Sequence, residues 1–82
     1  MKRFTIGDKD TYDLAEARCH QIMLGYETNQ DLPIYDEVIG EVPDHMLPQI
    51  TLPEIMNYLA EHGYTKEKIH ACINHWIDSV DF

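Results

Sequence analysis

Apolar residues recur at helical spacing over the last third of the chain, where start and stop signals mark two helices joined by a turn. Thr51 and Glu54 form a capping box, and Pro53 lies in the first turn, where its missing N–H is tolerated. Gly63 favours the left-handed conformation that ends a helix, and Thr65 is suited to cap the next one. The pattern predicts helices over residues 52–62 and 66–80, which together form a helical hairpin spanning residues 51–80.

Each helix of this hairpin has one apolar stripe, with residues spaced three or four apart. In the first helix the stripe consists of Leu52, Ile55, Met56 and Leu59. In the second helix it consists of Ile69, Cys72, Ile73, Trp76, Ile77 and Val80. Because such a stripe buries one side of a helix, we expect both stripes to face a common core.

The first half of the chain predicts one more helix and a little sheet. A helix is expected over residues 11–24, capped by Asp10 or Thr11 and ended by Gly25. Its apolar stripe consists of Tyr12, Ala15, Cys19, Ile22, Met23 and Tyr26. Alternation of apolar and polar residues predicts short strands at 2–6 and 34–39, which can pair as a small two-stranded β element. The expected fold is therefore mainly α, with three helices.

Length and composition favour a single small acidic domain over residues 1–82. A run of about 18 apolar residues, which a membrane span requires, is missing from the sequence. The basic start, Met1 to Phe4, is not followed by the apolar stretch of a secretory signal. The two cysteines, Cys19 and Cys72, then fit free thiols in a reducing compartment, so we expect a cytoplasmic protein that does not enter a membrane.

Negative charge is concentrated in the middle of the chain. The net charge is −9, and residues 19–65 contain no Lys or Arg. Eight acidic residues lie in this span: Glu27, Asp31, Asp36, Glu37, Glu41, Asp44, Glu54 and Glu61. Such a surface repels nucleic-acid phosphates and attracts basic surfaces, so direct nucleic-acid binding is disfavoured.

Candidate metal ligands are present but poorly arranged. Cys72 and His75 have the spacing of two zinc ligands on one helix, whereas His70 points to another side. No paired Cys-x-x-Cys element accompanies them, so we expect Cys72 to pack in the core. The stretch from Asp8 to Asp13 resembles the start of a calcium loop, yet it lacks the required glycine and the bidentate glutamate. No metal or cofactor is predicted.

Catalysis and DNA binding are also disfavoured. Both cysteines lie on apolar stripes, where burial raises the pKa of a thiol, and there is no glycine-rich phosphate loop or nucleophile elbow. We therefore predict that the protein is not an enzyme. The 51–80 hairpin has helix-turn-helix spacing and exposes Lys66 and Lys68, but six basic residues are few for binding to DNA phosphates.

A protein-binding role is the leading hypothesis. We expect the acidic central segment to dock on a basic surface of a partner protein, as an inhibitor or regulator of a nucleic-acid-handling complex. The candidate docking residues are Glu27, Asp31, Asp36, Glu37, Glu41 and Asp44. Small acidic anti-defence proteins of phages, which mimic nucleic acid, offer an analogy in size and charge only. The alternatives are a helix-turn-helix-like or zinc-binding regulatory module that uses the 51–80 hairpin, and a homodimer formed through the apolar stripes.

Overall fold

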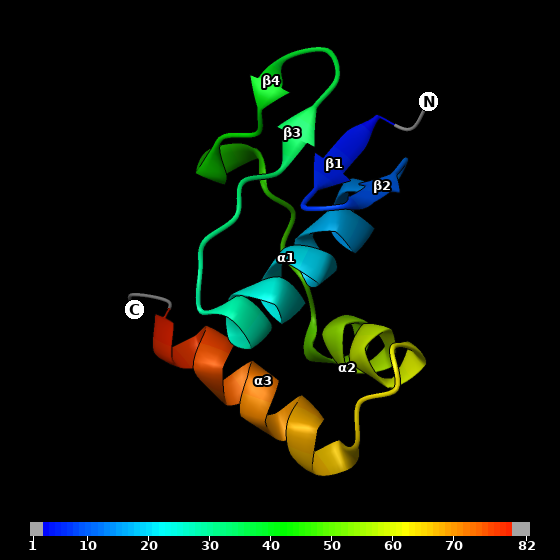
Figure 1. The fold of residues 1–82 in the computed structure, drawn as a ribbon, viewed down its shortest axis with the longest axis vertical. Helices are drawn as coiled ribbons and strands as arrows, with labels where there is room; N and C mark the ends of the chain where they lie inside the picture. Colours follow the sequence, from blue (N-terminus) through cyan, green and yellow to red (C-terminus); the bar gives the residue numbers. More distant parts are fainter. Residues whose placement is uncertain (1–2, 80–82) are drawn as a thin grey trace.

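The computed structural model describes residues 3–79, which form three α-helices, a four-stranded antiparallel sheet and one short 3-10 helix (Figure 1). In chain order these elements are β1 (Phe4–Ile6), β2 (Lys9–Thr11), α1 (Leu14–Thr28), β3 (Tyr35–Asp36), β4 (Gly40–Glu41), η1 (Asp44–Met46), α2 (Leu52–Glu61) and α3 (Lys66–Ser79). No helix within the described residues combines the length and the apolar character needed to cross a membrane.

The sheet is larger than the predicted two-stranded element. Its strand order is β2-β1-β3-β4, so two hairpins are joined through the antiparallel pair of β1 and β3. Gly7, at φ 58°, makes the tight turn that places Lys9 opposite Ile6 and creates β2, a strand that the sequence analysis missed. The strand predicted at 34–39 is in fact β3 and part of a turn, and the chain folds back before Gly40 into β4.

Helix α1 lies between the sheet and the other two helices (Figure 1). Toward α2 and α3 it contributes Cys19, Ile22 and Met23 to the larger core cluster. Toward the sheet, Ala17 packs with Phe4, Ile6, Ile34 and Val42 in a smaller cluster. At about 100° per residue these two sets project from opposite sides of the helix, so α1 is buried on two faces. The mainly α prediction therefore needs correction, because a sheet layer covers one of those faces.

The ends of α1 also differ from the prediction of 11–24. Asp13 is the N-cap, and its Oδ1 accepts the N–H of Ala15 at 2.9 Å, so the helix begins at Leu14. Tyr12 thus precedes the helix and is 69% exposed, outside the stripe in which it was placed. Gly25 does not end the helix, which continues to Thr28 and is terminated by Asn29 in the left-handed conformation.

The α2–α3 hairpin forms as the capping signals predict. The Thr51 hydroxyl accepts the N–H of Glu54 at 3.4 Å. At the other end of α2, the N–H of Tyr64 donates to Leu59 O and the N–H of Gly63 donates to Ala60 O, which is a Schellman ending. The stripes are only partly buried, because Leu52, Met56 and Ile77 are exposed. The predicted Val80, the end of helix 66–80 and the start of strand 2–6 lie outside the described residues.

Candidate functional site

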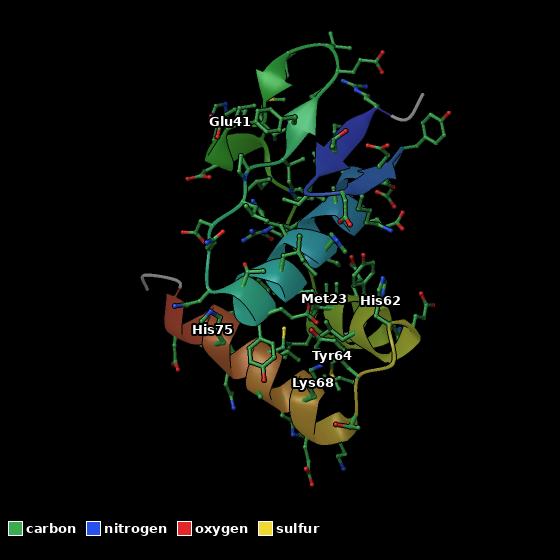
Figure 2. The ribbon with its side chains drawn as sticks, viewed as in Figure 1. Met23, Glu41, His62, Tyr64, Lys68 and His75 are labelled. Atoms are coloured by element: carbon green, nitrogen blue, oxygen red, sulfur yellow. The ribbon has the colours of Figure 1, made fainter. Side chains whose placement is uncertain are left out.

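A groove of about 1010 Å³ opens along α1 on the side where the long connections pass. Its floor is formed by Arg18, Gln21 and Gly25, which lie on α1 between the two buried faces, and by the adjoining Ile22 of the face toward α2 and α3. Residues 29–34 and 41–50 form its walls, and His75 and Trp76 of α3 lie at one end. Figure 2 shows Glu41 near the sheet and His75 on α3, both of which line the groove.

Two side chains of α1 fix the polar framework of this groove. Gln21 Nε2 donates to the carbonyl of Leu32 at 2.8 Å, which holds the loop after α1 against the helix. Arg18 Nη1 donates to Gln21 Oε1 at 2.5 Å. Burial lowers the pKa of Arg18, while the nearby carboxylates of Asp44 and Asp31 act in the opposite direction. The guanidinium is thus a half-buried cation on the groove floor.

Three of the six predicted docking residues lie together around this groove. Asp31 comes from the loop after α1, Glu41 from β4 and Asp44 from the first position of η1. All three are exposed. The fold therefore gathers carboxylates that are up to 13 positions apart in the sequence at one concave surface.

Asp36 has a different role in the fold. Its side chain is 3% exposed and forms an ion pair with Arg3, whose Nη2 lies 3.1 Å from Asp36 Oδ2. Asp36 Oδ1 also accepts the N–H of Val38 at 2.8 Å. The hydrogen bond with Arg3 and that backbone N–H lower the pKa of Asp36. This carboxylate holds the β3–β4 turn to β1 and is covered by its own chain.

The two remaining candidates lie apart from the groove lining. Glu27, near the end of α1, accepts a hydrogen bond from the Tyr64 hydroxyl, and burial followed by this contact raises the pKa of Tyr64. Glu37 is exposed in the β3–β4 turn, next to Val38, which is 75% exposed, and Ile39. The acidic segment thus presents apolar side chains beside its carboxylates.

A second polar cluster lies between α1 and α2. His20 Nδ1 and the Tyr58 hydroxyl share a hydrogen bond of 2.8 Å. His62, labelled in Figure 2, donates from Nδ1 to the carbonyl of Tyr58 at 2.9 Å. Burial, with Lys9 and His62 nearby, lowers the pKa of His20. This cluster links α1 to α2, with His20 and Tyr58 buried and His62 exposed.

The predicted metal and thiol candidates are not assembled into a site. Within residues 3–79, no three His, Cys, Asp or Glu side chains are grouped so that they could hold a metal ion. Cys19 and Cys72 are free and buried, and burial raises the pKa of each thiol to about 11. A thiol with that pKa is almost entirely protonated near neutral pH and is a poor nucleophile.

No family model, curated protein or solved structure was found to match this chain. The residues that the sequence analysis missed are Arg18 and Gly25 on the groove floor and Trp76 at its end. Arg18, Gln21, Ile22 and Gly25 follow one another at spacings of three, one and three, which is a helix stripe, so a signal was present. It was obscured because the stripe mixes charged, polar and apolar residues.

Proposed function

We propose that this chain is a non-enzymatic protein-binding module that docks its acidic central segment on a basic surface of a partner protein. The convergence of Asp31, Glu41 and Asp44 on one groove is the main support. Residues 19–65 contain no Lys or Arg that could neutralise this segment internally. Charge of one sign steers association with a surface of opposite sign.

The positions of the basic side chains support the same proposal. Arg3 is paired with Asp36, and Lys9 Nζ lies 3.2 Å from Glu16 Oε1. Lys68 Nζ lies 4.3 Å from the centroid of the Tyr64 ring, on the α3 side of the molecule (Figure 2). Arg3 and Lys9 are therefore paired away from the groove carboxylates, and Arg18 is the one Lys or Arg among the groove lining.

Exposed apolar residues of the β3–β4 hairpin would add contact area. Val38 and Ile39 lie between Glu37 and Glu41, and all four are exposed. Protein interfaces commonly join an apolar centre to a polar rim, and purely charged contacts add little affinity by themselves. A nucleic-acid-binding surface of the partner fits best, because it is built to receive negative charge. We place this interaction in the cytoplasm, where both thiols would stay reduced.

Charge reversal at the groove tests the proposal. The variant D31K/E41K/D44K changes the net charge from −9 to −3, since each replacement adds two positive charges. Asp36 is left unchanged because its carboxylate holds the fold. A matched control, D8K/E61K/E67K, makes the same change in net charge at exposed residues that do not line the groove.

Tagged wild-type and variant proteins would be used to capture partners from a lysate at low and high salt, with identification by mass spectrometry. We expect wild type and control to retain the same basic protein at low salt and to release it at high salt. The groove variant should lose this protein while its circular dichroism stays helical. Equal capture by all three would contradict the proposal and favour the exposed faces of the 51–80 hairpin.

A further inference from the structure

The groove has apolar walls as well as a charged rim. Leu32, Leu47, Ile50 and Trp76 line it, and each is only partly buried. Ile22 adds an apolar position on the floor. An occupant that brought apolar side chains to these walls would remove their remaining exposed surface from water, which is favourable.

The net charge of the groove lining determines which charge an occupant should carry. Asp31, Glu41 and Asp44 oppose a single guanidinium, that of Arg18, so the lining has a net charge of −2 with His75 neutral. Within residues 3–79 Arg18 forms no ion pair, and its side chain donates a hydrogen bond to Gln21. The carboxylates at the rim are exposed and available to cationic side chains.

The size and position of the groove favour an extended segment. Its volume of about 1010 Å³ lies just above the range of about 300–1,000 Å³ that small-molecule pockets occupy. β4 is one of the two edge strands of the sheet, and its Glu41 and the following Val42 line the groove. Edge strands receive extended peptides, whose alternate side chains point to opposite sides.

We propose that this groove binds an extended peptide segment in which basic side chains alternate with apolar ones. The basic side chains pair with the rim carboxylates of Asp31, Glu41 and Asp44, and the apolar side chains pack against Leu32, Ile50 and Trp76. This inference rests on the proposed function, because it specifies what part of the basic partner enters the acidic surface.

Gly25 permits a test that leaves charge unchanged. A Cβ at this position meets Gln30 O at 4.0 Å, an ordinary contact, and Gly25 lines the groove floor. The variant Gly25→Leu therefore places a side chain in the groove while replacing a helix-interior glycine by a better helix former. Two further variants change one charge each: Arg18→Met removes the cation on the floor, and Gln49→Lys adds one at an exposed lining residue.

The probe is a fluorescein-labelled peptide that alternates lysine and leucine, followed by fluorescence anisotropy. Control peptides alternate lysine with glycine and glutamate with leucine. We expect the lysine–leucine peptide to bind wild type best, and Gly25→Leu to weaken it by about tenfold or more. Arg18→Met should strengthen binding and Gln49→Lys should weaken it, each by about two- to fivefold.

The outcomes separate this inference from the proposed function. Equal binding of the lysine–glycine peptide, or no change in Gly25→Leu, would overturn the groove inference and leave only surface attraction. If D31K/E41K/D44K loses the captured partner while Gly25→Leu keeps it, the proposed function stands and the groove inference fails. Tight binding of the glutamate–leucine peptide would contradict the assigned charge.

Discussion

The two sides of α1 are held together by different kinds of interaction. Toward α2 and α3 the contacts are mainly apolar, and Ile55, Leu59 and Cys72 are completely buried, with the hydrogen bonds of His20 to Tyr58 and of Tyr64 to Glu27 at the edges of this core. Toward the sheet the apolar cluster is smaller, and the ion pair of Arg3 with Asp36 joins residues 33 positions apart. The groove lies along α1 with its walls in the connections before and after the β3–β4 hairpin.

This difference suggests separate roles for the two sides, one in stabilising the fold and the other in displaying binding residues. The helical side has a start signal at both α2 and α3 and a stop signal between them, and it buries the larger cluster. The sheet side has strands of two or three residues and exposes acidic and apolar side chains at its turns. We infer that the helices stabilise α1 as a platform, while the sheet side displays the residues that meet a partner.

The largest effect on stability is expected in the helical core. Leu59→Ala should lower the free energy of unfolding by about 2–5 kcal/mol, because Leu59 is 0% exposed and its loss leaves a cavity. Leu52→Ala, at a position 51% exposed in the same helix, should change it by less than about 0.5 kcal/mol. Urea unfolding measures both. Similar losses of unfolding free energy in the two variants would contradict the assignment of Leu59 to the core.

A pair of glycine variants tests the local signals of the helical side. Gly63→Ala should destabilise by about 1–2 kcal/mol, because Gly63 has φ 83° and alanine is strained there. Gly25→Ala, in the interior of α1, should stabilise by about 0.5–1 kcal/mol. Thermal unfolding compares the two. No loss of stability in Gly63→Ala would show that the Schellman ending has no specific role.

On the sheet side, Asp36→Asn should have a local effect. It removes the charge that pairs with Arg3 and weakens the acceptor for the Val38 N–H. Hydrogen exchange by NMR should show faster exchange at Val38 and in β1, with Leu59 in α2 unchanged. Glu37→Gln, at the exposed neighbour, is the control and should change neither. Faster exchange throughout α2 would mean that the two sides unfold as one unit.

The smallest expected effect is a change of stability with pH that arises from His20, which lies between α1 and α2. Because the folded pKa of His20 is lowered, the unfolded chain takes up a proton first, so stability should be complete above about pH 6.5 and fall as pH drops below it. The groups facing His20 are Tyr58, His62, Lys9, Asp8 and Glu27. His20→Gln should flatten this dependence. His45→Gln, at an exposed residue of η1, should leave it unchanged.

The sequence predicts the helical side well because its signals are local. The N-cap at Thr51 and the stop at Gly63 act within five residues, and both are present in the structure. The Glu54 side chain accepts from the Thr51 hydroxyl. The sheet side depends on the register between β1 and β3, which no local pattern specifies. Alternation predicted β1, β3 and their pairing, whereas β2 and β4 are too short to be recognised. The turn residues Val38 and Ile39 resemble a strand by composition, so the second strand was predicted too long.

The candidate site was predicted in part for the same reason. The exposed carboxylates follow from the composition of residues 19–65, whereas their convergence on a groove depends on how two distant segments return to α1. Composition could not predict that Asp36 is buried in an ion pair, because only the β1–β3 pairing brings Arg3 to it. Arg18 was missed because its helix stripe mixes charged, polar and apolar residues, which obscures the helical spacing.

The most direct test of the account is a map of the interface. NMR spectra of the labelled chain would be recorded with and without the basic protein that it captures. We predict the largest shift changes at the amides of residues 29–50, around the groove and the β3–β4 hairpin. Changes confined to the outer faces of α2 and α3, at residues such as Leu52, Met56 and Lys66, would contradict the account and make the helical hairpin the binding surface.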